Sequence, residues 1–258
     1  MMRESLVKHL RAASRFMALC CVTAGLYFSW LAVAPLALPW PDASRRWRAL
    51  VFRAWARAVC RIAGMRVGVR GVPPRGAFLL VSNHLGYMDV VALASVSDCV
   101  FVAKSEVAGW PVLGRLCRSV NTIFVNRRRR RSLPGVIERV ERALQRGSGV
   151  VVFAEGTSTG GASVAPFRSP LLDIAARKAM PVHFASLSYR TPPRCPPARE
   201  AVCWWGDMTF LKHLYGLFAL PRFDAEVVFG EQPVRDGDRK ALARKLWAAV
   251  SAQFVPVV

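Results

Sequence analysis

The sequence predicts an α/β protein with a single, mostly parallel mixed sheet flanked by helices, preceded by an N-terminal membrane-embedded helical segment. From residue 66 onward, short runs rich in β-branched and aromatic residues alternate with helical patterns, which is typical of a largely parallel sheet with covered faces. Before residue 66 lie an uncharged apolar run and an arginine-rich helical pattern. We therefore expect membrane-anchoring helices over residues 1–65 and a globular domain over residues 66–258.

The first element is an apolar run without charge between Phe16 and Pro41. It is long enough to cross a hydrocarbon core of roughly 30 Å. A secretory signal peptide is the alternative, because basic residues precede the run and the Ala-Val-Ala sequence at 32–34 resembles a cleavage site. Pro35, directly after that site, and the length of the run favour an uncleaved anchor. Arginines flank both ends, so the sequence leaves open whether the run spans the membrane or enters one leaflet.

The second element is an amphipathic helix over residues 44–64. Its apolar face comprises Trp47, Leu50, Val51, Ala54, Trp55, Ala58, Val59 and Ile62. Its other face carries most of Arg46, Arg53, Arg57 and Arg61. This pattern is typical of a helix in a membrane interface with its cations toward lipid phosphates. A helix packed on the protein's own core has the same pattern, and that alternative stays open.

The remaining elements form the sheet and its covering helices. Eight β-rich runs predict strands at 66–70, 77–82, 99–103, 121–125, 149–154, 181–187, 201–205 and 225–230. Helical patterns occupy 88–96, 110–120, 132–147 and 170–180. A C-terminal helix is expected within 235–254, capped near Asp236 or Asp238, and the proline-rich stretch 190–200 reads as a surface loop.

Composition restricts the partners. The 37 Lys and Arg residues outnumber the 16 Asp and Glu residues, giving a net charge of +21 that favours anionic partners. Five consecutive arginines at 127–131 could contact nucleic acid, but no helix-turn-helix or aromatic-interleaved basic patch accompanies them. Anionic membrane lipids are therefore the expected partners, and nucleic acid is not. The seven cysteines, odd in number and without a C-x-x-C pair, suit reduced thiols facing the cytoplasm and predict no metal site.

His84 is the first candidate catalytic residue. It follows the apolar run at 77–82, at the end of a parallel strand where ligands bind in such sheets. Asp89 lies in the first turn of the next predicted helix, where its carboxylate can bond one imidazole nitrogen and fix the tautomer. The other nitrogen is then free to accept a proton from a hydroxyl. A structural histidine that caps the helix has the same spacing.

Four blocks of sequence, in this order and at these separations, resemble the glycerolipid acyltransferase family that includes the 1-acylglycerol-3-phosphate acyltransferases. The blocks are SNHLGYMDVVAL, FVAKSEVAGWPVLGRLCRSVNTIFVNR, VVVFAEGTSTGG and AMPVHFASL. The resemblance covers residues 66 to about 190. It implies that His84, with Asp89 as its partner, is the general base on an acceptor hydroxyl that attacks an acyl thioester. Acyl carrier protein or coenzyme A would carry the acyl group, and no metal or redox cofactor is required.

The resemblance also implies binding residues for the acceptor head group. In the second block these are Arg127 and Lys104. In the third block they are Glu155, Gly156 and Thr157, since a strand ending in Glu-Gly-Thr can cradle an anion with backbone N–H groups and hydroxyls.

Two departures from the family's third block bear on the acceptor. Ala154 replaces the usual proline, and Ser158 stands where many members carry an arginine that contacts phosphate. Arg168 or the arginines at 127–131 could supply the missing cation. Serine at this position, followed by a glycine and by P-F-R-S, also resembles the lyso-ornithine-lipid acyltransferase branch.

A serine hydrolase is the remaining alternative, because residues 156–160 fit G-x-S-x-G. Ser158 would be the nucleophile, completed by Asp173 or Asp207 and by His183 or His213. A nucleophile elbow should run straight into a helix, whereas small residues and Pro166 delay any helix here until about residue 170.

Taken together, these features predict a membrane-bound O-acyltransferase. We expect it at the inner (cytoplasmic) membrane, with the catalytic domain at 66–258 facing the cytoplasm. The expected reaction acylates 1-acyl-sn-glycerol-3-phosphate to phosphatidic acid, and acylation of lyso-ornithine lipid is the alternative.

Overall fold

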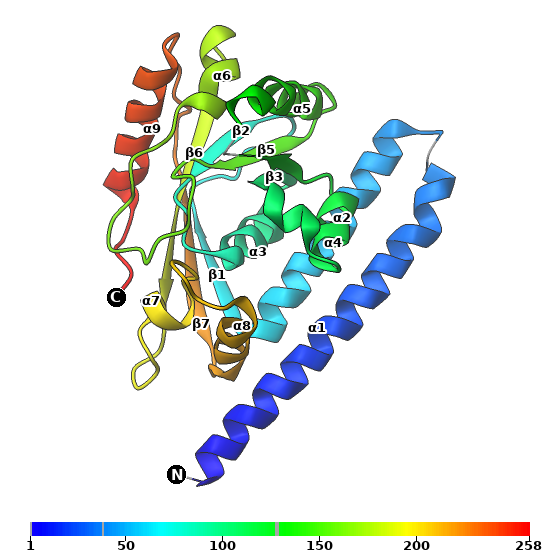
Figure 1. The fold of residues 1–258 in the computed structure, drawn as a ribbon, viewed down its shortest axis with the longest axis vertical. Coiled ribbons are helices and arrows are strands. Elements are labelled where there is room, and N and C mark those ends of the chain that lie inside the picture. The colour runs from blue at the N-terminus through cyan, green and yellow to red at the C-terminus, as the bar shows by residue number, and fades with distance from the viewer. Residues whose placement is uncertain (1, 38, 127–128) are drawn as a thin grey trace.

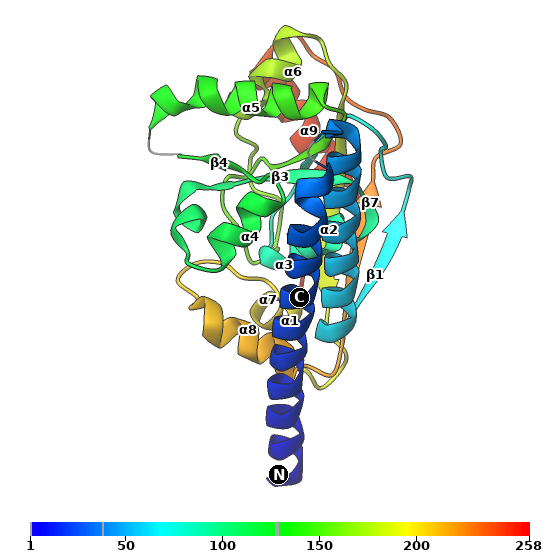
Figure 2. The same cartoon turned by 90° about the vertical axis from the view of Figure 1, so that its right-hand side faces the viewer.

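Two N-terminal helices run antiparallel beside the rest of the molecule (Figures 1 and 2). The structure is a computed structural model that describes every residue except 1, 38, 127 and 128. Helix α1 (Met2–Ala37) leads through a short turn into α2 (Pro41–Ala63), and the Trp55 indole N–H donates to the Thr23 hydroxyl at 3.0 Å. Nearer its N-terminus, α1 contacts α8 (Phe210–Ala219): the Arg15 guanidinium donates to the Leu220 carbonyl just beyond that helix at 2.6 Å.

Helix α2 packs on the core of the globular domain. Its buried residues are Ala56, Val59, Cys60 and Ala63. Two of its arginines contact the domain as well: Arg53 pairs with Asp98 at 2.5 Å, and Arg57 donates to the Ser95 carbonyl at 3.0 Å. The expectation that these two cations face lipid phosphates was therefore wrong, and the alternative of a helix packed on the protein's own core is confirmed.

The sheet has seven strands in the order β1-β7-β6-β2-β5-β3-β4. Their bounds are β1 Met65–Arg70, β2 Leu79–Ser82, β3 Cys99–Lys104, β4 Ile123–Val125, β5 Gly149–Phe153, β6 Val182–Arg190 and β7 Phe223–Phe229. Every pairing is parallel except that of β6 with β7. This confirms a single, mostly parallel mixed sheet.

Helices cover both faces of the sheet (Figure 1). The covering helices are α3 Tyr87–Val96, α4 Leu113–Ser119, α5 Leu133–Gln145, α6 Asp173–Arg177, α7 Ala198–Ala201 and α9 Arg239–Gln253, together with α2 and α8. Alternate residues of the central strands face two separate cores: Leu80 and Val151 pack with α2 and α3, whereas Leu79 and Val150 pack with α5, α6 and α9. Burial on both faces explains why these strands read as continuous apolar runs.

Three expectations about the elements need comment. Residues 201–205 do not form a strand, because they follow the short helix α7 and the Trp204 N–H donates to the Leu85 carbonyl at 2.8 Å instead of joining a ladder. Asp238 caps α9 through a bond from the Ala241 N–H to its carboxylate at 2.7 Å, which decides between the two proposed caps. Helix α2 ends at Ala63 and β1 begins at Met65, but α2 packs on the core of the globular domain, so the division at residue 65 stays a prediction.

Among the described residues, α1 is the one helix long and apolar enough to cross a membrane, over Ser5–Leu36. Large apolar side chains are exposed at the turn between α1 and α2, where Leu36 is 71% and Trp40 65% exposed. The N-terminal part is thus a candidate for membrane contact.

Candidate active site

The candidate site forms where parallel strands end at one edge of the sheet. Ser82 of β2 lies opposite Phe153 of β5, and Phe101 of β3 lies opposite Val151. The first, second and third sequence blocks therefore leave the sheet side by side. Asn83 fixes the end of β2 to β6, since its side chain bonds both the N–H and the carbonyl of Leu187, at 2.7 and 2.9 Å.

His84 and Asp89 form the central pair of the site. Their Nδ1 and Oδ2 atoms are 2.7 Å apart, and the Asp89 side chain is fully buried. The same oxygen accepts the N–H groups of Leu85 and Gly86 at 2.6 and 3.0 Å, while Oδ1 accepts the Tyr189 hydroxyl at 2.7 Å. An ionised carboxylate can only accept hydrogen bonds, and Asp89 accepts them from Leu85, Gly86 and Tyr189. Toward the imidazole it therefore accepts from Nδ1–H.

This bond orients the histidine as a base. With the proton on Nδ1, the Nε2 atom carries a lone pair, and no described residue bonds to it. The imidazole stacks on the Phe153 ring with centroids 4.1 Å apart, and its side chain is 19% exposed. The result is a fixed ring with one accessible basic nitrogen.

Gly86 allows the tight turn between His84 and Asp89. Its φ is 157°, a value that favours glycine, and an added Cβ would lie 2.8 Å from the Trp204 backbone nitrogen. The turn therefore brings the carboxylate five residues further on back to the imidazole.

Glu155 holds the third block against the histidine. One carboxylate oxygen accepts the His84 N–H at 2.6 Å, and the other accepts the Ala165 N–H at 3.0 Å. The Thr159 N–H donates to the His84 carbonyl at 2.9 Å from the other side. Burial raises the pKa of Glu155 to about 7, against the lowering effect of the two N–H bonds. The geometry gives Glu155 a positioning role, and its predicted contact with the acceptor stays a prediction.

Beyond Glu155, a glycine and an arginine shape the loop. Gly156 has φ +79°, and an added Cβ would lie 2.8 Å from Cδ and Nε of Arg168. The Arg168 side chain thus lies across the glycine, and its Nε donates to the Glu155 carbonyl at 3.3 Å. Thr157 is exposed and Ser158 half-buried, and the N–H groups of both donate to no described residue. A cation and two N–H groups are therefore available to an anion.

The basic residues of the second block are only partly described. Lys104 ends β3 and is exposed, at the same edge of the sheet as His84. Arg127, two residues beyond the end of β4, lies outside the described residues.

The structure does not assemble the serine hydrolase triad. No helix follows Ser158 until Pro170. Asp173 pairs with Arg177 and Arg239, and His213 bonds the Tyr87 hydroxyl instead of a carboxylate. Among the described residues no three His, Cys, Asp or Glu side chains gather as metal ligands would. Among the described residues Ser158 bonds neither His183 nor His213, and neither histidine bonds a carboxylate, so the structure does not support the hydrolase alternative.

Tyr189 is a residue of the candidate site that the sequence analysis missed. Its hydroxyl donates to Asp89 from β6, 100 positions along the chain, and burial next to that carboxylate raises its pKa well above the ordinary value. A tyrosine in an apolar strand carries no local signal of this contact. The sequence analysis ended this strand at residue 187, and only the strand order of the sheet places Tyr189 beside the strand that leads to His84.

Known proteins are similar to this chain in sequence and in fold. A family model described as acyltransferase matches residues 66–189. A lyso-ornithine lipid O-acyltransferase of Brucella abortus is 34% identical over 220 residues, which is 80% of this chain and 82% of the relative. A 1-acyl-sn-glycerol-3-phosphate acyltransferase of Neisseria gonorrhoeae is 27% identical over 73% of this chain and 74% of the relative.

A solved structure agrees with the fold. The crystal structure of a 1-acyl-sn-glycerophosphate acyltransferase from Thermotoga maritima superposes with a TM-score of 0.60 over 92% of this chain and 97% of that one, at 19% identity. The residues matched by the family model include His84, Asp89 and Glu155. The chain belongs to the acyltransferase family.

Proposed function

We propose that the chain transfers a fatty acyl group from a thioester to the hydroxyl of a lysolipid, with His84 as general base. The single observation that carries this mechanism is the His84–Asp89 pair, with a buried carboxylate on Nδ1 and an accessible Nε2. Nε2 takes the proton as the acceptor oxygen attacks the thioester carbonyl. The attack forms the new C–O bond. Collapse of the tetrahedral intermediate then restores the carbonyl, breaks the C–S bond and expels the thiolate, which receives the proton from His84.

Asp89 stabilises the imidazolium that forms during this step. The carboxylate is held by Leu85, Gly86 and Tyr189, so it need not reorganise when His84 becomes charged. No serine or cysteine nucleophile is required, because acyl transfer is direct. We propose acyl carrier protein or coenzyme A as the donor's carrier, with no further cofactor, and the net charge of +21 suits either anionic carrier.

Lyso-ornithine lipid is the acceptor that the observations favour. Four relatives with 31–35% identity are named lyso-ornithine lipid O-acyltransferases, each over at least 77% of this chain. Ser158 lacks the positive charge expected of a phosphate-contacting arginine. An ornithine head group carries a carboxylate with a single negative charge. The one positive charge of Arg168, together with the N–H groups of residues 157 and 158, can bind it.

1-Acyl-sn-glycerol-3-phosphate is the second candidate acceptor. The position of Arg168 over Gly156 favours this acceptor. Its guanidinium supplies a positive charge near Ser158, which stands where an arginine that contacts phosphate is expected. Lys104 at the end of β3 adds a second cation at the same edge of the sheet.

We propose that α1 lies along the membrane surface and enters one leaflet, at the cytoplasmic face of the inner membrane. α1 contacts α8 through Arg15 and α2 through Thr23, so the polar domain lies beside much of its length. A helix crossing the bilayer in this arrangement would draw the domain's charged surface into hydrocarbon, which is costly. The two free cysteines exposed on α1 and the buried thiols of the domain fit a reducing compartment.

An acceptor panel with purified protein in detergent tests the proposal. Acyl thioester is supplied with lyso-ornithine lipid, with 1-acylglycerol-3-phosphate or without a lysolipid, and products are read by lipid mass. We expect diacyl product with lyso-ornithine lipid above all. Product with 1-acylglycerol-3-phosphate alone would replace the acceptor and keep the mechanism. Fatty acid release without any acyl transfer would refute the proposed function.

A further inference from the structure

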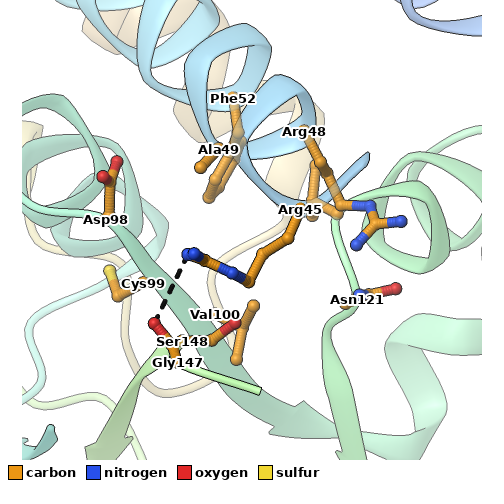
Figure 3. A pocket seen from close by; sticks show the side chains of 11 residues that line it. Arg45, Arg48, Ala49, Phe52, Asp98, Cys99, Val100, Asn121, Gly147 and Ser148 are labelled. Atoms are coloured by element: carbon orange, nitrogen blue, oxygen red, sulfur yellow. Dashed lines mark hydrogen bonds between the residues drawn. The ribbon is translucent and has the colours of Figure 1, made fainter. Parts of the chain in front are cut away.

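A cationic cavity lies at the opposite edge of the sheet from His84. Its walls come from the first half of α2 and from the amino ends of β3 and β5 (Figure 3). His84, by contrast, follows the carboxyl end of β2. Arg45 and Arg48 enter it from α2, Asn121 from the turn before β4, and Ser148 from the turn before β5. Its volume of about 40 Å³ leaves room for about three water molecules, and hence for one tetrahedral oxyanion.

Positive charge in this cavity is not balanced. The one acid in its lining, Asp98, already pairs with Arg53 at 2.5 Å. Arg45 reaches the Gly147 carbonyl at 3.4 Å, and its nearest carboxylate, Asp42, is 3.9 Å away and largely exposed. No described residue pairs with Arg48, and burial together with the nearby Arg146 lowers the pKa of its guanidinium.

Donors without partners line the same space. The Nε–H groups of Arg45 and Arg48 are buried and have no hydrogen-bond partner among the described residues. The side chains of Asn121 and Ser148 bond no described residue either, and Asn121 lies below the Arg48 guanidinium in Figure 3. An anion in the cavity would offer acceptors to the two arginine side chains and to the side chains of Asn121 and Ser148.

Apolar side chains at the same end of α2 indicate the source of the anion. Leu36 and Trp40, at the turn that precedes Arg45 and Arg48, are 71% and 65% exposed, and Leu50, just beyond Arg48 on α2, is 59% exposed. A soluble anion would make no contact with these apolar side chains, whereas the acyl chains of a lipid can cover them while its phosphate binds the arginines. We propose that this cavity binds the phosphate group of an anionic membrane lipid, separately from the acyl transfer site.

The inference goes beyond the proposed acyl transfer and does not depend on it. The cavity lies at the amino ends of the strands and contains no residue of the candidate active site. Variants of the cavity should therefore keep their activity on detergent-dispersed substrates, while His84 variants should keep lipid binding. Failure of one proposal can thus be told from failure of the other.

Thermal unfolding with a short-chain phosphatidylglycerol below its micelle concentration is the test, with the full-length protein in non-ionic detergent. The wild type should gain a saturable increase in melting temperature. Arg48→Gln and Arg45→Gln should each bind at least about tenfold more weakly. Arg46→Gln is the matched control, because it removes the same charge from an exposed position of the same helix turn, and it should stay within about twofold of wild type.

Two further arms distinguish the remaining explanations. Ser148→Val keeps every charge but fills the cavity, so it should lose binding as Arg48→Gln does. Inorganic phosphate should stabilise the protein much less than the short-chain lipid. Equal losses in Arg46→Gln and Arg48→Gln would indicate general surface attraction and overturn the site. Equal stabilisation by inorganic phosphate would overturn the lipid as its source, and retained binding in Ser148→Val would overturn the cavity as its location.

Discussion

Replacing Asp89 by asparagine tests how the buried carboxylate assists His84. The substitution keeps the shape of the side chain and removes its charge. The amide oxygen can still accept from His84, Leu85 and Gly86, and the amide N–H₂ can donate to the Tyr189 oxygen. The fold should therefore survive, and the lost quantity is the attraction between the carboxylate and the imidazolium.

The size of that attraction follows from the geometry. Oδ2 lies 2.7 Å from Nδ1, and the two charge centres lie somewhat further apart. With an effective dielectric constant of about 20, Coulomb's law gives roughly 4 to 6 kcal/mol. Because this energy acts only once His84 has taken the proton, it lowers the barrier, and kcat should fall by about 10³- to 10⁴-fold in the variant.

The assay is product formation at saturating lysolipid and acyl thioester, read by lipid mass, with thermal unfolding as the check on folding. Asp173→Asn is a matched control, because it removes a carboxylate from arginine pairs outside the site and should keep kcat within about twofold. A folded Asp89→Asn variant that retains more than about a tenth of wild-type kcat would refute the electrostatic role.

Three further substitutions test the surroundings of this pair. Tyr189→Phe leaves one oxygen of Asp89 without a donor, so denaturant unfolding should show a loss of about 1–3 kcal/mol, with a smaller fall in kcat than in Asp89→Asn because the His84 bond persists. Glu155 has a pKa raised to about 7 from its ordinary 4.5, so its contribution to stability is complete below pH 4.5 and is lost as the pH rises through 7. Because glutamine does not titrate, the free energy of unfolding of Glu155→Gln should rise by about 2 kcal/mol relative to that of the wild type between pH 5 and pH 8. If the difference between the two proteins stayed the same over this range in unfolding titrations, the raised pKa would be contradicted. Gly156→Ala should lose about 1–2 kcal/mol of stability and raise the acceptor KM by displacing Arg168, whereas Gly76→Ala, with φ +72° and open space around it, should lose stability alone.

The fold could be predicted where burial on both sides of the sheet leaves a continuous apolar run. The strands around residues 79–82 and 149–153 are of this kind. The run at 201–205 is equally apolar, yet its residues pack beneath the active-site loop through Trp204 and form no ladder. In both cases the apolar composition predicts correctly that the residues are buried. It does not predict which element they pack against. The same ambiguity explains why the arginines of α2 were assigned to lipid when Arg53 and Arg57 contact the domain.

The candidate site could be predicted where its parts are near in sequence. His84 and Asp89 are five residues apart, so a turn and a helix start suffice to join them. Tyr189 and Glu155 reach the same pair from β6 and from the end of β5, and only the strand order brings them there. Contacts at such separations depend on the register of the sheet, which a single sequence does not specify.

A double-mutant cycle on His84 and Asp89 tests the central claim most directly. Purified wild type, His84→Ala, Asp89→Asn and the double variant are compared for kcat with lyso-ornithine lipid and acyl thioester, after thermal unfolding confirms that each is folded. If Asp89 acts through His84, the double variant should be no slower than His84→Ala, which should have lost nearly all activity. Losses that multiply in the double variant, or substantial activity in His84→Ala, would contradict His84 as the general base.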